Sequence, residues 1–171
     1  MTDADQFEAF VRKHQDMVFA TAVRLLGNPA EAEDVAQIVF LRAFQRFDAI
    51  GSSPSAAAWL RTVARNACLN HLSRYRARWR LFSELASSES GAAELTFEAP
   101  GSPATAMEEA EERRRLEQSL RELPDHQRVP LVLFHFEELS YQEIASALGV
   151  SLTKVKTDIH RGRLALANLL K

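Results

Sequence analysis

Cysteine is nearly absent from this chain of 171 residues, with a single example at Cys68. One cysteine excludes an internal disulfide and a cysteine-based zinc site. Cys68 lies in an apolar helical pattern, so we expect a small buried side chain there. The five histidines are scattered along the chain without metal-ligand spacing. The sequence therefore predicts no metal site, no cofactor and no catalytic centre, and it favours a protein that is not an enzyme.

Long hydrophobic runs are also missing. No stretch approaches the roughly 18 apolar residues that cross a bilayer. The first five residues, MTDAD, lack the basic and then apolar pattern of a secretory signal. Hydrophobic residues still make up 46% of the chain, which is enough for folded cores. We expect a cytoplasmic protein without membrane insertion.

An overall excess of basic charge is missing as well. The formal net charge is −2, which argues against a nucleic-acid-binding protein until the distribution is considered. Residues 61–80 contain six arginines and no acid, whereas residues 83–107 contain four glutamates and no lysine or arginine. Residues 151–171 contain five basic residues, opposed only by Asp158. Two basic blocks separated by an acidic stretch indicate two surfaces that bind phosphate.

Apolar residues recur at three- and four-residue steps, as is typical of amphipathic helices. We expect Gly27 to end the first helix in the left-handed conformation and Asn28 to cap the second, with Glu31 reaching back to the cap. Residues 48–53 are interpreted as a Gly/Ser loop, and Pro54 as the start of a third helix. The second and third helices are expected to pack through their apolar faces. The residues of these faces are Val35, Ile38, Val39, Phe40, Ala43, Phe44, Phe47, Trp59, Leu60, Val63, Ala64, Ala67, Cys68, Leu72 and Tyr75.

A segment of Ser, Gly, Ala, Pro and Glu at residues 83–104 shows little periodicity and predicts a flexible acidic linker. It separates two predicted helical domains, residues 1–82 and 105–171. No strand is predicted anywhere. The fold class is therefore all-α, with two small helical domains joined by a flexible linker and a helix-turn-helix in the second.

The spacing of residues 140–163 favours that helix-turn-helix. A small residue, Ala145, stands where the two helices touch; Gly149 allows the tight turn; Val155 packs the second helix on the first. Ser151 is placed to cap the second helix. A plain helical hairpin with solvated charges is the alternative. The residues expected on the outward side of the second helix, toward base edges and phosphates, are Lys154, Lys156, Thr157, His160 and Arg161.

Arginines and aromatic residues alternate along the third predicted helix and beyond it. Charge for phosphate and flat rings for unstacked bases are the needs of single-stranded or melted DNA. For Trp59 and Tyr75 we favour a core position. For Asn66 and the arginine cluster, which includes Arg61 and Arg65, we favour DNA binding.

The second predicted helix carries a different signal. Its first turn is acidic, which suits the helix dipole. Asp34 and Gln37 are too far along the helix to cap its first turn, and they lie on one face. Phe40 and Leu41 lie further along the same face. This combination indicates a surface that binds a partner protein.

Together, these segments resemble the group IV (extracytoplasmic-function) sigma factors of bacterial RNA polymerase over nearly the whole chain. The first motif is AEDVAQ at 32–37 followed by VFLRAF at 39–44, and the second is WLRTVARN at 59–66. The third comprises LP at 123–124, QR at 127–128, LSYQEIA at 139–145, LGVS at 148–151 and VK at 155–156.

The resemblance implies a role for each surface. The positions that dock on the clamp helices of the polymerase's largest subunit are Asp34, Gln37, Phe40 and Leu41. The positions that melt and read the −10 promoter element, with the 48–55 loop, are Arg42, Ile50, Arg61, Arg65 and Asn66. The positions that read the −35 element as duplex are Lys154, Lys156, Thr157, His160 and Arg161. The implied partners are the polymerase core with its flap, promoter DNA, and an anti-sigma factor that holds the free, monomeric protein inactive.

Some residues depart from the family pattern. Ile38 replaces an acid, and Ile50-Gly51 replaces an aromatic-Arg-Gly sequence in the base-capturing loop. Asp158 replaces a residue that is often Arg; such an acid either repels phosphate or accepts a hydrogen bond from cytosine N4. Pro130 either kinks its helix or delays the start of that helix.

Two other functions remain open from the residues. A helix-turn-helix regulator that dimerises on a palindrome accounts for residues 139–163 but not for the second helix. A sigma mimic that binds anti-sigma factors and no promoter accounts for the departures. Such a mimic is expected to lose its DNA-facing basic residues, which this chain keeps.

Overall fold

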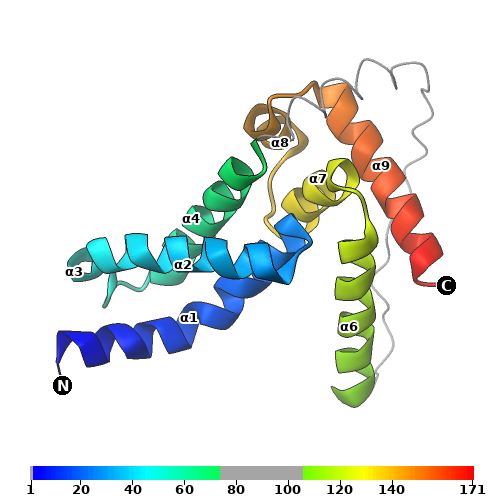
Figure 1. Ribbon diagram of the computed structural model, residues 1–171. Coiled ribbons are helices and arrows are strands. Elements are labelled where there is room, and N and C mark those ends of the chain that lie inside the picture. The colour runs from blue at the N-terminus through cyan, green and yellow to red at the C-terminus, as the bar shows by residue number, and fades with distance from the viewer. Residues whose placement is uncertain (1, 74–105) are drawn as a thin grey trace. The chain divides into compact units, whose positions relative to one another are not determined.

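The computed structural model describes residues 2–73 and 106–171, and helices are the regular secondary structure throughout these two ranges (Figure 1). The predicted all-α fold is confirmed. The chain divides into two compact units, residues 1–74 and 75–171, called here the N-terminal and C-terminal units. The predicted domain boundaries, the linker at 83–104 and the arginines from Arg74 to Arg80 lie outside the described residues. None of the described helices is long and apolar enough to cross a membrane.

In the N-terminal unit, α1 (Asp3–Leu26), α2 (Pro29–Gln45) and α4 (Ala56–His71) pack against one another, with the short helix α3 (Phe47–Ile50) between α2 and α4 (Figure 1). Each helix turns one apolar stripe toward the other two. The side chains that this packing buries most completely include Val18, Ala22, Leu25, Val35, Val39, Leu60, Ala64 and Cys68. The predicted burial of Cys68 is therefore confirmed.

Local signals set the ends of these helices. Gly27 ends α1 with φ 68°, the left-handed conformation predicted for it. The Asn28 side-chain oxygen accepts from the backbone N–H groups of Ala30, at 2.9 Å, and Glu31, at 3.2 Å. The carboxylate of Glu31, expected to reach back to the cap, lies 3.3 Å from Nε2 of His71 and so links α2 to α4.

The predicted Gly/Ser loop at 48–53 is wrong in its first part, because Phe47 to Ile50 form α3. Apolar side chains at both ends of this turn stabilise it by packing against the rest of the unit, and Ile50 is buried. Gly51 then allows the backbone to pass close to Phe47. A Cβ at this position would lie 2.8 Å from the ring and from the carbonyl oxygen of Phe47. Helix α4 begins at Ala56, two residues later than Pro54.

Aromatic rings join the start of α1 to the end of α2. Phe7 meets Phe44 and Phe47 edge-on, with ring centroids 5.1 and 5.3 Å apart. Phe10 meets Phe47 at 5.4 Å and the His14 ring at 4.6 Å. Phe44, expected in the core, contacts the Phe7 ring but remains 62% exposed.

We expect His14 to make the N-terminal unit sensitive to mild acid. The side chain is 9% exposed, and burial, then Lys13, lowers the pKa of its imidazole. The unfolded chain takes up this proton near pH 6.5, whereas the folded chain does so only at lower pH. The unfolding free energy therefore falls as pH drops below about 6.5, by up to about 1.4 kcal/mol per pH unit. Unfolding exposes Cys68, so the reaction of Cys68 with a thiol reagent measures the unfolding free energy. The rate at each pH is divided by the rate in urea-unfolded protein at the same pH. His14→Leu should remove the pH dependence, and an unchanged dependence in that variant would contradict the assignment.

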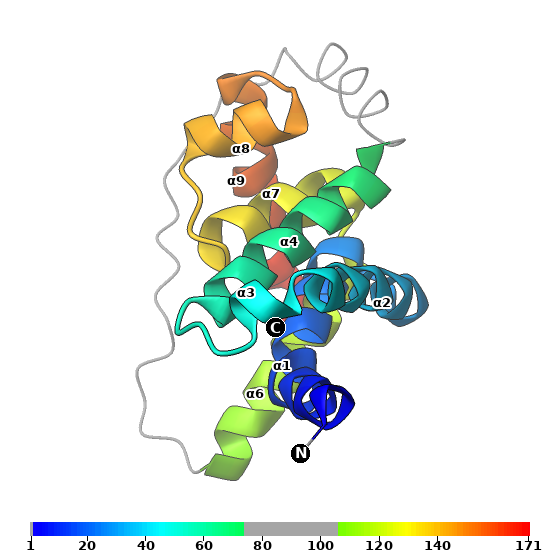
Figure 2. The same cartoon turned by 90° about the vertical axis from the view of Figure 1, so that its left-hand side faces the viewer.

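The C-terminal unit contains α6 (Ala106–Glu122), α7 (Asp125–His135), α8 (Tyr141–Leu148) and α9 (Leu152–Leu169). Figure 2 shows α7, α8 and α9 close together, with α6 below them in this view. Every residue from 106 to 115 in α6 is exposed. The core side chains that are buried most completely are Leu120, Val129, Val132, Leu133, Ile144, Leu148, Val155 and Ile159.

Two residues shape the corner between α6 and α7. Arg128 is 3% exposed; its guanidinium donates to the carbonyl oxygen of Leu123 at 2.8 Å and pairs with Asp125. Pro130 lies inside α7, which begins at Asp125, so the prediction of a later start is wrong. Proline cannot donate the backbone hydrogen bond of an interior position, and α7 accommodates this at a buried site.

Candidate nucleic-acid interface

The predicted helix-turn-helix is formed by α8 and α9. Ser140 Oγ accepts from the backbone N–H of Glu143, and the Glu143 carboxylate accepts from that of Ser140, both at 3.1 Å. Gly149 ends α8 with φ 68°. Ser151 Oγ then caps α9 by accepting from the backbone N–H of Lys154 at 3.1 Å, and Val155 is buried. Every backbone turn of this motif is thus set by its own nearby residues.

Four of the five predicted reading residues of α9 lie on its accessible side. Lys156 is exposed, and the other three are partly exposed. We call them the reading face: Lys156, Thr157, His160 and Arg161. Their spacing of one and four residues places them on adjacent rows of the helix.

Lys154 does not belong to the reading face, so the prediction that it points outward is wrong. It is 7% exposed, and its ammonium lies 2.7 Å from Oδ2 of Asp158. The helical period brings positions 154, 155, 158 and 159 to the inward side of α9. Asp158 is also buried, at 5% exposure. Its carboxylate pairs with Lys154 and is not presented on the accessible side of α9, which argues against both expectations for it, repulsion of phosphate and recognition of cytosine.

A second polar surface lies on the N-terminal unit. On α4, Arg61 and Asn66 are exposed and Arg65 is partly exposed; we call these three the basic face of α4. Arg42 on α2 is exposed as well. Ile50, predicted to read the −10 element, is 8% exposed and its side chain belongs to the core.

The remaining aromatic predictions have mixed outcomes. Trp59, expected in the core, is only partly buried. Tyr75 and Trp79 lie outside the described residues. A shallow hollow of about 520 Å³ between α1 and residues 51–57, lined in part by Lys13 and His14, was not predicted. Sequence patterns do not reveal it, because its two walls are far apart in the chain.

Helix α2 turns apolar side chains outward. Ile38, Leu41 and Phe44 are 44, 64 and 62% exposed. Asp34 and Gln37 are exposed on the same helix, whereas Phe40 is only partly so. We call the exposed set the outer face of α2: Asp34, Gln37, Ile38, Leu41 and Phe44. The sequence pointed to Leu41 but assigned Ile38 and Phe44 to the helix's apolar positions.

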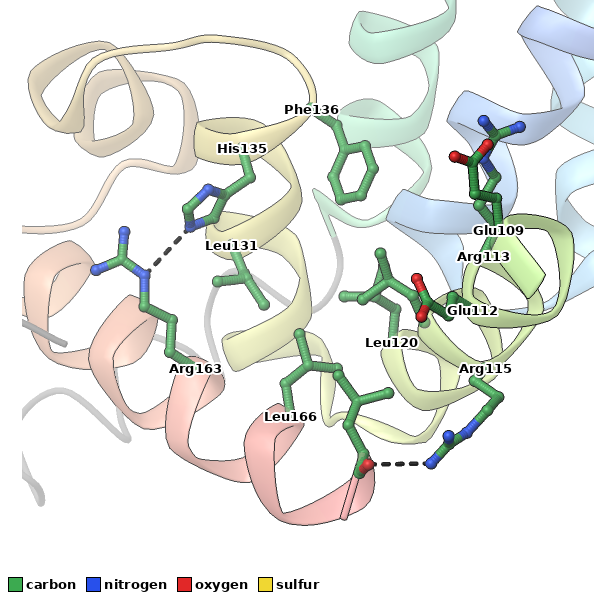
Figure 3. Close-up of a pocket in the computed structure, with 12 residues that line it drawn as sticks. Glu109, Glu112, Arg113, Arg115, Leu120, Leu131, His135, Phe136, Arg163 and Leu166 are labelled. Atoms are coloured by element: carbon green, nitrogen blue, oxygen red, sulfur yellow. Dashed lines mark hydrogen bonds between the residues drawn. The ribbon is translucent and has the colours of Figure 1, made fainter. Parts of the chain in front are cut away.

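A groove of about 600 Å³ runs between α6, α7 and α9 (Figure 3). Its apolar lining is Leu116, Leu120, Leu131, Phe136, Leu166 and Leu170. At one end, Arg115 donates to the carbonyl oxygen of Leu170 at 3.0 Å. Along the other edge, Arg163 donates from Nε to Nε2 of His135 at 3.2 Å. The sequence did not predict this groove, because it depends on the angle at which α6 leaves the other helices.

The His135 imidazole acts as a hydrogen-bond acceptor at the edge of the groove and is therefore neutral. Burial lowers the pKa of His135, and the Arg163 guanidinium lowers it further. Within residues 2–73 and 106–171, no three side chains of His, Cys, Asp or Glu gather to hold a metal ion. The surfaces described above present positive charge, polar side chains and exposed apolar groups.

Two family models match separate parts of the chain. Residues 10–79 match the family model of sigma-70 region 2, and residues 113–166 match that of sigma-70 region 4. The chain is 33% identical to the ECF RNA polymerase sigma factor SigW of Bacillus subtilis over 170 residues, 99% of this chain and 91% of that protein. It is 34% identical to the RNA polymerase sigma-E factor of Streptomyces coelicolor, over 99% of this chain and 86% of that protein.

A solved structure shares the fold. The sigma factor RpoE of Bartonella quintana, in complex with the anti-sigma factor NepR, superimposes with a TM-score of 0.50. The alignment covers 96% of each chain at 22% sequence identity. At that identity the likeness concerns the fold alone.

Proposed function

This chain belongs to the extracytoplasmic-function (ECF) sigma factors of bacterial RNA polymerase, and on that premise we propose which surface binds each part of the transcription machinery. A sigma factor binds core polymerase and directs it to promoters. The polymerase performs the chemistry, so the chain itself needs no catalytic group. Its place of work is the cytoplasm, where promoter DNA is found.

The C-terminal unit reads the −35 element with the reading face of α9. The observation that carries this assignment is a capped helix-turn-helix whose accessible side holds Lys156, Thr157, His160 and Arg161. A helix of this kind enters the major groove, where side chains meet base edges and phosphates together. Lys154, being buried, takes no direct part.

The N-terminal unit melts and reads the −10 element with the basic face of α4. The two arginines suit the backbone of an unpaired strand, and the Asn66 amide suits a base edge. Arg42 extends this surface onto α2. Because the Ile50 side chain is buried, its role is to shape the adjoining loop, leaving the exposed Ser52 to face an unstacked base.

Two apolar surfaces bind the core polymerase. The outer face of α2 has exposed Leu41 and Phe44 beside polar Asp34 and Gln37, as expected of a contact with the clamp helices of the largest subunit. The groove of the C-terminal unit, with its volume of about 600 Å³ and its apolar lining, accepts a helix of the polymerase flap.

An anti-sigma factor covers such surfaces while the protein is free. Exposed large apolar side chains on a monomer mark sites of protein association, and Leu41 and Phe44 are two of them. The related RpoE is known in complex with the anti-sigma factor NepR. Release from a partner of this class would then make the outer face of α2 available to the polymerase.

Run-off transcription tests this function. Purified core polymerase with this chain should give specific transcripts from DNA upstream of the chain's own operon. Asn66→Ala and Arg161→Ala should each lower the yield about tenfold at limiting protein, because each removes a contact worth about 1–3 kcal/mol. Arg12→Gln, in an exposed pair with Glu8 on α1, serves as the control.

Other outcomes identify the alternatives. A chain that binds an anti-sigma factor but no core polymerase is a sigma mimic. A palindromic footprint without polymerase indicates an independent helix-turn-helix regulator. Either result would overturn the assignments made above.

A further inference from the structure

Helix α9 carries an ion pair on its inward side. The Lys154 ammonium lies 2.7 Å from the carboxylate of Asp158, one turn later, and the two side chains are only 5 and 7% exposed. Gly162 continues the same side, where an added Cβ would lie 3.2 Å from the backbone oxygen of Gln127 in α7. The pair therefore faces the interior of the domain, close to α7, and offers no surface to a ligand.

The pair lies near the start of α7. A residual void of about 10 Å³ is lined by Lys154 and Asp158 together with His126, Pro130, Leu148, Val150 and Val155. A void of this size has room for no more than about one water molecule, so bulk water does not reach the two charges. His126 is the second residue of α7. Asp158 and the first turn of α7 thus line the same void, and the partial positive charge at a helix N-terminus favours a nearby carboxylate.

Neighbouring charges act on this carboxylate. Burial raises the pKa of Asp158, while Lys154, His126 and Arg161 oppose that rise. The same groups act on His126, whose pKa is lowered mainly by burial. The titratable side chain of His126 in α7 therefore interacts electrostatically with Lys154, Asp158 and Arg161 of α9, where the two helices meet.

Stability alone does not account for such a pair. The cost of desolvating two charges roughly offsets their attraction, and apolar residues of the same size often stabilise a core as well. An ion pair is directional, however, whereas apolar side chains tolerate several packings. One residue step turns a helix by about 100°. A rotation of α9 that exposed the pair would therefore turn Thr157 and Arg161 away from DNA.

We propose that the Lys154–Asp158 pair is a positioning element for promoter recognition. Asp158 anchors α9 to the start of α7, and Lys154 neutralises it. Together they set the rotation of α9 that presents the reading face to the −35 element. This inference rests on the proposed role of α9 as the −35 reader. Lys154 and Asp158 are positioning residues and do not touch DNA.

Paired substitutions separate orientation from stability. Lys154→Met/Asp158→Leu and Lys154→Met/Asp158→Asn both remove the pair without leaving one charge buried. The full-length chain, assembled with core polymerase, is tested on duplexes randomised at the −35 position. Both variants should keep the helical circular dichroism of the wild type. The preference for the selected sequence over a scrambled one should fall about tenfold, which is the worth of one base pair.

Three further measurements identify why the paired variants lose their sequence preference. Lys154→Arg, which retains the charge pair, should keep the preference of the wild type. On the scrambled duplex, the paired variants should keep the wild-type salt dependence, whereas Lys156→Met should lower the slope by about 0.9 for one lost phosphate contact. In the wild-type chain without DNA, reductive methylation should modify Lys156 quickly, whereas Lys154 should react slowly whether or not DNA is present.

The remaining outcomes overturn the proposal. Folded variants with unchanged preference, or unfolding of both paired variants, would assign the pair to stability alone. A reduced salt slope, or methylation of Lys154 that only DNA prevents, would make Lys154 a phosphate contact. If the wild type selects no sequence, the proposed role of α9 itself fails, and the inference fails with it.

Discussion

Lys154→Met should destabilise the C-terminal unit by about 3–5 kcal/mol, because it leaves the Asp158 carboxylate buried without its partner. This is a large part of the total stability of a small domain. Asp158 is 5% exposed, so water cannot replace the ammonium without local unfolding. The effect should be confined to the unit that contains α9.

Hydrogen exchange followed by mass spectrometry measures this prediction element by element. Peptides from α7 and α9 should lose protection in Lys154→Met, while peptides from α1 keep theirs. The matched control is Lys156→Met, two residues away on the same helix and exposed, which should change stability by no more than about 0.5 kcal/mol. Equal effects of the two substitutions would place Lys154 at the surface and contradict its burial.

Leu41→Glu should weaken binding to core polymerase about 30-fold, corresponding to the roughly 2 kcal/mol of an interface hot spot. Leu41 is 64% exposed, so the substitution costs the free protein little, but in the complex it buries a carboxylate where an apolar contact is expected. Fluorescence anisotropy of labelled protein titrated with core polymerase measures the change.

The control for this prediction is Arg12→Gln, which lowers the net charge by one, as Leu41→Glu does, at an exposed position of α1. Its affinity for core polymerase should equal that of the wild type. If Leu41→Glu binds equally well, the outer face of α2 is not the polymerase contact. The groove of the C-terminal unit would then be the next surface to test.

Helix termini were the features best predicted from the sequence. Gly27 and Gly149 adopt the left-handed conformation, and Asn28 and Ser151 cap the helices expected of them. These interactions join a side chain to backbone groups two or three residues away. They depend on local chemistry alone, so the residue types and their spacing are sufficient evidence.

Exposure is harder to predict from the sequence because it depends on what covers each helix face. The charge of Lys154 predicts an outward position, yet this residue lies on the side of α9 that packs against the core. The ring of Phe44 predicts an inward position, yet at the end of α2 it is 62% exposed. Periodicity defines the rows of a helix, but only the neighbouring helices determine which rows are buried.

The sequence by itself determined the all-α class, the helix caps, the helix-turn-helix and the resemblance to ECF sigma factors, since each rests on short-range spacing. The tertiary structure decided the groove between α6, α7 and α9, the outer face of α2 and the pairing of Lys154 with Asp158. These features arise from the angles and rotations at which helices pack. Burial then decides whether a charge meets DNA or another charge, because an ion enters the interior only when a partner offsets its lost hydration.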